Sequence, residues 1–119
     1  MPYTVMVVDD NKLIRTLLTD ILNRDGFTVI SADSFIGAIT AIIDAFPDLL
    51  IIDYHMDGMN GAELIETLRR TSRFALMPII GLSGVSGSEA KLMDAGASTY
   101  VAKPIREESI TRVVKKFLF

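Results

Sequence analysis

The 119-residue chain contains no cysteine and no tryptophan, and His55 is its only histidine. The absence of cysteine excludes disulfide bonds, thiolate nucleophiles and sulfur-ligated zinc or iron–sulfur centres. A single histidine likewise excludes a catalytic histidine pair and a metal site built from several histidines. Any metal site in this chain must therefore rely on oxygen ligands.

A strong charge of one sign is also lacking, because 12 Lys and Arg residues stand against 15 Asp and Glu residues, for a net charge of -3. This balance argues against direct nucleic-acid binding through a basic face. No apolar run approaches the roughly 18 residues of a membrane span, and no basic segment precedes an apolar stretch at the N-terminus. With half of its residues apolar, the chain is predicted to be a single cytoplasmic domain over residues 1–119.

The central feature is an apolar run at residues 49–53 that ends on Asp53 and is followed by a glycine-containing loop. Four consecutive apolar residues between turn signals predict a strand buried on both faces, as in a parallel sheet covered by helices. Asp53 has two interpretations at this stage. It either begins a turn, or it serves chemistry, since open α/β sheets bind ligands beyond the carboxyl ends of their strands.

Strands and helices are predicted to alternate along the whole chain. Apolar, β-rich runs predict four further strands at residues 3–8, 27–32, 78–82 and 99–102. Helical spacing of apolar residues predicts five helices: between Asn11 and Gly26, over 35–46, from 61 to about 71, from after 87 to about 95, and around 110–117. Because parallel strands need crossover helices, this order predicts an α/β fold with a doubly wound five-stranded parallel sheet and helices on both faces.

The second predicted helix is unusually apolar, with Asp44 as its only charge. Ile36 and Ile43 widen its apolar surface, which we interpret as a broad stripe facing the core, with a partner surface as the less favoured alternative. The same spacing places Leu13 on the apolar face of the first helix and Arg69 on the solvent face of the third.

Four of the five predicted strands end on a reactive side chain. These side chains are Asp9 and Asp10, Asp53, Ser83 and Lys103. Since the carboxyl ends of parallel strands lie at one edge of a sheet, they predict a single site with three carboxylates, one hydroxyl and one ammonium. Converging carboxylates repel one another, so either one of them stays protonated or a hard divalent cation such as Mg²⁺ neutralises them. A metal, a lysine and a hydroxyl around one carboxylate are what phosphoryl transfer to an aspartate requires.

With Lys103 followed by Pro104 and preceded three residues earlier by Tyr100, this set resembles the response-regulator receiver domain of two-component signalling over essentially the whole chain. The resemblance implies a flavodoxin-like strand order of 2-1-3-4-5. It also implies that Asp53 is the phospho-acceptor and becomes a phosphoaspartate. Ser83 and Lys103 would contact the phosphoryl group rather than the resting site, and Tyr100 would swing inward as a switch residue.

The resemblance also implies a magnesium site. Asp10, Asp53 and the backbone carbonyl of His55 would bind Mg²⁺ directly, and Asp9 would hold it through water. The His55 side chain is interpreted as a solvated loop residue, with tuning of acyl phosphate hydrolysis as the alternative.

The implied role is that of a phosphoprotein in signal transduction and not of an enzyme with turnover, beyond transfer to its own Asp53 and slow self-dephosphorylation. The phosphoryl donor would be a histidine kinase or, in a phosphorelay, a histidine phosphotransfer protein. The output would be a downstream effector protein or an output domain outside this chain, and a homodimer is left open.

Two positions and the length of one segment beside the site bear on this resemblance. Asp57 stands where the family commonly has proline, and it is expected to add negative charge near the metal. The segment from Ser83 to Lys103 is slightly shorter than is common, which affects how the fourth helix begins. Gly84 keeps the small residue expected beside the phosphoryl entrance.

Other function classes fit the sequence less well. A haloacid-dehalogenase-like phosphatase needs an aspartate two residues after its nucleophile, where this chain has His55. A serine hydrolase would need Gly-x-Ser-x-Gly, and the sequence around Ser83 lacks the final glycine. A pseudo-receiver that binds a partner without phosphorylation is disfavoured by the complete set Asp10, Asp53, Ser83 and Lys103.

Overall fold

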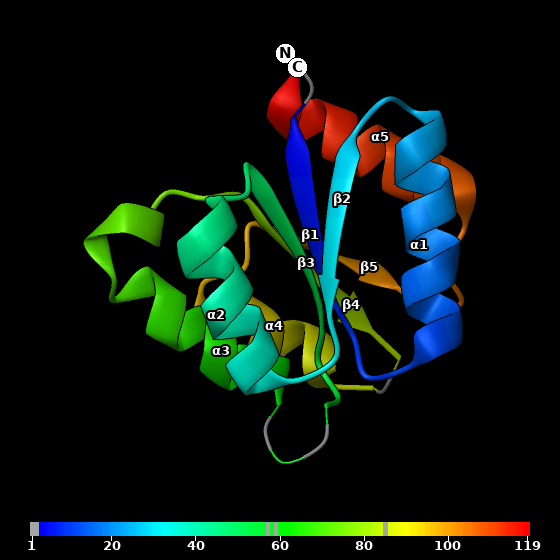
Figure 1. Cartoon of the computed structure of the whole chain (residues 1–119). Helices are drawn as coiled ribbons and strands as arrows, with labels where there is room; N and C mark the ends of the chain where they lie inside the picture. Colours follow the sequence, from blue (N-terminus) through cyan, green and yellow to red (C-terminus); the bar gives the residue numbers. More distant parts are fainter. Residues whose placement is uncertain (1–2, 57, 59, 85) are drawn as a thin grey trace.

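The computed structural model describes residues 3–56, 58, 60–84 and 86–119 (Figure 1). Asp57 lies outside the described residues, and so does Val85 in the connection that follows Ser83. The expectation that Asp57 adds charge near a metal is therefore left as a prediction from sequence.

The five strands form one parallel sheet in the order β2-β1-β3-β4-β5, which confirms the predicted fold and its strand order. Their bounds are β1 (Thr4–Val8), β2 (Thr28–Ala32), β3 (Leu49–Asp53), β4 (Ile79–Ser83) and β5 (Thr99–Ala102). β3 lies between β1 and β4, so the strand that ends on Asp53 is the middle strand of the sheet.

Helices cover both faces of this sheet, with α1 and α5 on one face and α2, α3 and α4 on the other (Figure 1). Their bounds are α1 (Lys12–Arg24), α2 (Phe35–Ala45), α3 (Gly61–Arg69), α4 (Ser88–Ala95) and α5 (Glu107–Leu118). The short 3₁₀ helix η1 (Ser72–Phe74) follows α3 and was not predicted. None of the helices in the described ranges is long and apolar enough to cross a membrane.

Side-chain caps explain where three of the helices begin. The side chain of Asn11 accepts hydrogen bonds from the amides of Leu13 and Ile14, Ser34 caps α2 and Asn60 caps α3 in the same way. These caps satisfy amides of the first turn that have no partner inside the helix. The chain therefore turns from strand to helix at defined positions directly after β1 and β2.

The core has two apolar layers, one on each face of the sheet. Along β3, Leu49 and Ile51 join the layer under α1 and α5, while Leu50 and Ile52 join the layer under α2, α3 and α4. All five residues of β3 are buried, which confirms the prediction of a strand covered on both faces. Asp53 is thus held at the end of a strand that is buried along its whole length.

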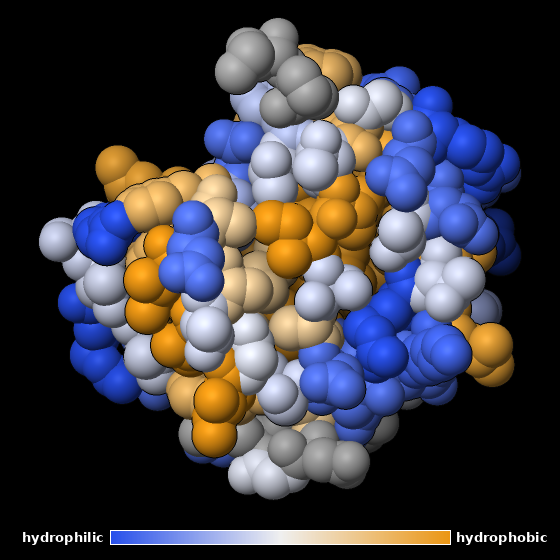
Figure 2. All heavy atoms as spheres, in the orientation of Figure 1, coloured by the Kyte–Doolittle hydropathy of each residue, from blue (hydrophilic) through white to orange (hydrophobic). Residues whose placement is uncertain are grey.

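The prediction that α2 presents a broad core-facing stripe is wrong for Ile36 and Ile43, which are 77% and 51% exposed. α2 buries Ala38 and Ile42, which lie four residues apart on one narrow line of the helix, so side chains off that line point outward. Figure 2 shows the resulting apolar strip along α2. Leu13 at the start of α1 is similarly exposed and not part of the core face.

This correction predicts different costs for two isoleucines of one helix. Ile42→Ala should lower the free energy of unfolding by about 2–5 kcal/mol because Ile42 is buried. Ile36→Ala should change it by about 0.5 kcal/mol or less because the side chain already lies in solvent. Urea unfolding followed by circular dichroism measures both, and equal losses would contradict the placement of α2.

Candidate functional site

The aspartates predicted to converge do meet at the carboxyl edge of the sheet. Asp9 and Asp10 directly follow β1, and Asp53 ends the adjacent strand β3. One carboxylate oxygen from each of the three lies within 4.8 Å of the others. Asp9 and Asp53 are buried and Asp10 is exposed, so the cluster opens to solvent on the side of Asp10.

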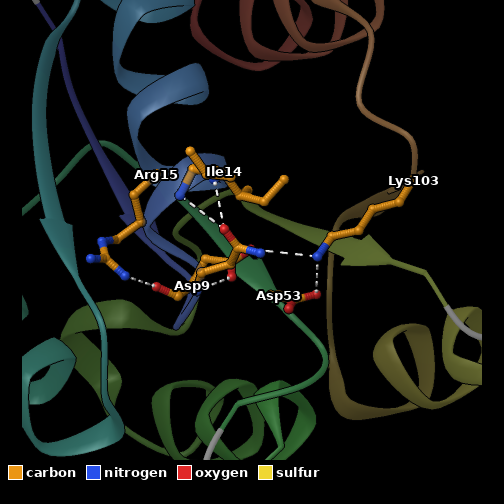
Figure 3. A network of polar contacts seen from close by, with 7 residues as sticks. Asp9, Ile14, Arg15, Asp53 and Lys103 are labelled. Carbon is orange, nitrogen blue, oxygen red and sulfur yellow. Dashed lines mark hydrogen bonds and ion pairs between the residues drawn. The ribbon is translucent and has the colours of Figure 1, made fainter.

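Lys103 extends from the end of β5 into this cluster (Figure 3). Its Nζ lies 3.2 Å from Oδ1 of Asp53 and 3.6 Å from Oδ2 of Asp9. The expectation that Lys103 contacts only a phosphoryl group is therefore wrong. The reason is that burial strengthens the attraction between an ammonium and nearby carboxylates, so Lys103 pairs with the site itself.

The electrostatics of the two buried aspartates are unfavourable to the ionised form. Burial raises the pKa of Asp9 and of Asp53, and the negative charges of neighbouring aspartates act in the same direction. Lys103 opposes the increase of the pKa at both carboxyls, and the Asn11 amide, which donates to Oδ1 of Asp9 (2.9 Å), opposes it at Asp9. The cluster therefore favours a proton or a cation.

Oδ2 of Asp9 is buried and has no hydrogen-bond donor among the described residues, although Lys103 lies near it. Arg15 donates to the backbone carbonyl of Asp9 (2.8 Å) and leaves this side-chain oxygen open (Figure 3). An unsatisfied buried carboxylate oxygen beside two further carboxylates fits a hard divalent cation. The atoms that could coordinate such a cation are all oxygens, which Mg²⁺ prefers as ligands.

Ser83 ends β4, next to Asp53 on the sheet, and is 3% exposed. Its Oγ shares a hydrogen bond with Oγ of Ser88, the equally buried first residue of α4. Ser88 was not found from the sequence, where it has no signal beyond standing at the start of a predicted helix.

Two glycines make room for the site. A Cβ atom on Gly61 would lie 2.2 Å from the backbone oxygen of Asp53, so only glycine lets α3 begin against the end of β3. The Gly61 amide donates to the carbonyl of Tyr54 (2.6 Å) at this return of the chain. A Cβ atom on Gly84 would lie 3.2 Å from Cδ of Lys103, so a small residue there leaves space for the lysine side chain.

Two predicted site residues lie outside the cluster. Tyr100 on β5 is 44% exposed and is turned to solvent. The His55 side chain is also exposed. Its ring and the ring of Tyr54 form a T-shaped pair with a centroid distance of 5.1 Å. Because His55 follows Asp53 by two residues, its backbone lies near the end of β3. Its exposed side chain agrees with the interpretation of His55 as a solvated loop residue.

A parallel α/β sheet with clustered aspartates and a paired lysine at its carboxyl edge defines a small domain of the signalling-receiver class. Residues 5–115 match the response regulator receiver domain family, and the chain belongs to that family. It is a receiver domain of two-component signal transduction and not a classical enzyme.

Curated relatives include the polar-differentiation response regulator DivK of Brucella anthropi, 26% identical over 99% of this chain and 98% of DivK. The phosphate regulon transcriptional regulatory protein PhoB of Escherichia coli is 26% identical over 97% of this chain, which spans only 51% of PhoB. A crystal structure of a candidate response regulator from Chloroflexus aurantiacus has a TM-score of 0.95 at 30% identity, covering 99% of this chain and 98% of that one.

The receiver domain of sensor histidine kinase PA1611 from Pseudomonas aeruginosa shares the fold, with a TM-score of 0.91 at 21% identity over 99% of this chain and 98% of that one. That structure has a magnesium ion coordinated in its active site cleft.

Proposed function

We propose that Asp53 accepts one phosphoryl group in an Mg²⁺-dependent reaction, and that phosphorylation switches the contacts of this domain with other proteins. The observation that carries the proposal is the position of Asp53, buried at the end of β3, within 4.8 Å of two other carboxylates and 3.2 Å from Lys103. A carboxylate in such surroundings is a nucleophile with its charge-neutralising groups already in place.

In the proposed step, a carboxylate oxygen of Asp53 attacks phosphorus and forms a new O–P bond. The bond from phosphorus to the donor breaks, and its electron pair leaves with the donor: nitrogen for a phosphohistidine, oxygen for acetyl phosphate. Lys103 then moves its pairing from the carboxylate to the phosphoryl oxygens, and Ser83 donates a hydrogen bond to one of them. Tyr100 turns inward in the phosphorylated state.

Asp10, Asp53 and the backbone carbonyl of His55 would hold the Mg²⁺ ion, with Asp9 acting through a water molecule. When bound, the ion supplies positive charge that offsets the carboxylates and the phosphoryl oxygens. The unsatisfied Oδ2 of Asp9 and the magnesium in the PA1611 receiver domain support this assignment.

We further propose that residues 1–119 form one receiver domain in the cytoplasm, with a histidine kinase or histidine phosphotransfer protein as the donor. The output passes to a downstream effector protein or an output domain, and homodimerisation is one form that the switch can take. Two kinds of relative support this range of outputs. The match covers 98% of DivK, which is about as long as this chain, and 51% of PhoB, which is longer. The small negative charge supports a role without direct nucleic-acid binding.

Phosphorylation by acetyl phosphate tests the proposal. With Mg²⁺, intact-mass measurement should show one added phosphoryl group on the parent protein and on Asp44→Asn, whose changed side chain is exposed on α2. Asp53→Asn should gain none, because an amide does not attack phosphorus in place of the carboxylate.

Equal labelling of Asp53→Asn and the parent would show that another residue is the acceptor. A parent protein that stays unlabelled with Mg²⁺ present would instead identify a pseudo-receiver.

A further inference from the structure

An apolar strip runs along the outer side of α2 and onto the residue that caps its C-terminus (Figure 2). Its members, which we call the α2 strip, are Ile36, Ile39, Ile43 and Phe46. Ile36 and Ile43 are exposed, Phe46 is 48% exposed, and Ile39 is half-buried against the core. The fold therefore leaves most of the α2 strip in water. An apolar surface of this kind on a small domain is typical of a contact site for another molecule.

The spacing of the α2 strip is that of the seam between two packed helices. Its members follow one another at intervals of three, four and three residues. These are the intervals between the a and d positions of a coiled coil, which form one narrow line on a helix. The series 3-4-3 is also the same in both directions. An antiparallel second copy of α2 would therefore set Phe46 against Ile36 and Ile43 against Ile39, twice, about a twofold axis.

The C-terminal end of the α2 strip has an unusual backbone conformation. Phe46 has a φ of 49° and a ψ of 65°, in the left-handed region that favours glycine after a helix. The guanidinium carbon of Arg73 lies 3.9 Å from the centre of the Phe46 ring, and the ring centroid of Phe74 lies 5.7 Å from it. A large ring thus occupies a position that suits glycine, and its neighbours hold it while half of it stays exposed.

The two ends of the α2 strip carry opposite charges. Asp33 is exposed and stands three residues before Ile36, directly ahead of the residue that caps α2. Arg73 is also exposed, and its contact with Phe46 places its positive charge at the other end of the strip. In the antiparallel arrangement, Phe46 faces Ile36 of the second copy, so each Arg73 comes close to Asp33 of the other copy. A parallel arrangement would bring like charges together instead.

We propose that the α2 strip binds the α2 strip of a second copy of this chain in an antiparallel, twofold-symmetric dimer. The symmetric spacing and the opposite charges at the two ends favour a second copy over a different protein. The 11 residues of α2 span only about 16 Å. The contact is therefore smaller than the roughly 800 Å² per partner of a standard stable interface, and we expect a dissociation constant of about 100 µM. The inference does not rest on the proposed phosphorylation of Asp53.

Sedimentation equilibrium without Mg²⁺ and without a phosphoryl donor tests the dimer at protein concentrations from about 10 µM to about 1 mM. The parent should show an equilibrium between monomer and dimer. Ile36→Glu should raise the dissociation constant about 10-fold or more, because it buries a charge in the apolar contact. The exposed position in the first turn of α2 tolerates glutamate in the monomer. Asp44→Asn is the control and should match the parent, because Asp44 lies about 100° around the helix from Ile43.

Exchange of the two end charges tests the antiparallel arrangement. Arg73→Glu and Asp33→Arg should each raise the dissociation constant about 5-fold, because each puts like charges together at both ends of the dimer. The double variant with both substitutions should associate about 3-fold or more tightly than Arg73→Glu, since opposite charges face each other again. Both of these proteins lack the Arg73 contact with Phe46, so its loss cancels in the comparison.

Each contrary result has its own meaning. A parent protein that stays monomeric over the whole concentration range overturns the proposal. Equal association of Ile36→Glu and the parent would show that the copies meet through another face. A double variant that associates no better than Arg73→Glu would overturn the antiparallel pairing. The phospho-acceptor role of Asp53 stands or fails separately, because these measurements contain neither Mg²⁺ nor a phosphoryl donor.

Discussion

Arg69→Met is expected to lower the free energy of unfolding by about 3 kcal/mol or more, because it removes the donor to several carbonyl oxygens at once. Arg69 is half-buried, and its Nε donates to the carbonyl of Gly96 (2.8 Å). Its Nη1 donates to the carbonyl of Met77 (2.7 Å) and to those of Phe74 (3.1 Å) and Ala75 (3.2 Å). One guanidinium therefore joins the end of α3 to η1, to the approach of β4 and to the turn before β5.

Burial lowers the pKa of Arg69 from its usual value, and the side chain still carries its charge at neutral pH. Methionine has a similar length but no donor, so the carbonyl oxygens would lose their partner while remaining partly shielded from water. Arg69→Lys should cost less than Arg69→Met, since an ammonium retains donors but not the planar fork.

Urea unfolding of Arg69→Met measures the loss of free energy of unfolding. Arg70→Met is the control, because the neighbouring Arg70 is exposed. Arg70→Met should change the free energy of unfolding by about 0.5 kcal/mol or less. Identical midpoints for the two variants would show that the carbonyl contacts of Arg69 add nothing to stability.

Arg69 also shows where prediction from sequence stopped. Helical spacing placed it on the solvent face of α3, and nothing in that pattern reveals the η1 segment that folds back over it. Ile36 was predicted to face the core but is exposed, for a related reason. An apolar residue matches the periodic pattern of a core-facing helix whether or not another element packs over it. Periodicity indicates which residues share one side of a helix. How much of that side is buried depends on elements from elsewhere in the chain that pack against it.

The candidate site could be predicted more fully because it depends on strand ends. Runs of apolar residues located the ends of β1, β3, β4 and β5, and parallel strands align their carboxyl ends, so Asp9, Asp53 and Lys103 were expected to meet. Ser88 could not be found in this way. Its contact with Ser83 is made between the end of β4 and the start of α4, and no periodic pattern in the sequence signals such a contact.

Magnesium is expected to have its largest effect on stability at neutral to alkaline pH. The pKa values of Asp9 and Asp53 are raised above their usual 3.8 mainly by burial, so the folded state holds protons more tightly than the unfolded chain. Their contribution to stability is therefore fully present below pH 3.8 and is lost as the pH rises through their folded-state pKa values. Asp10 faces the same cluster, and Lys103 offsets the loss in part.

A cation that replaces these protons restores the lost stability. At a free Mg²⁺ concentration about 100 times its dissociation constant, binding to the folded state alone adds about 2.7 kcal/mol to the free energy of unfolding. The gain should shrink as the pH falls toward the aspartate pKa values, since protons then compete for the carboxylates. Urea unfolding with chelator or with Mg²⁺, across a pH series, measures both effects.

Asp9→Asn is the decisive variant, because an amide keeps the oxygen that accepts from the Asn11 amide but removes the buried charge. In chelator, its free energy of unfolding relative to the parent should rise with pH, because the parent loses stability on ionising Asp9 and the variant does not. Its response to Mg²⁺ should be much reduced, while the exposed control Asp44→Asn should follow the parent in both respects. If Asp9→Asn and the parent gain equally from Mg²⁺, the ion binds elsewhere and Asp9 is buried without a role in holding it.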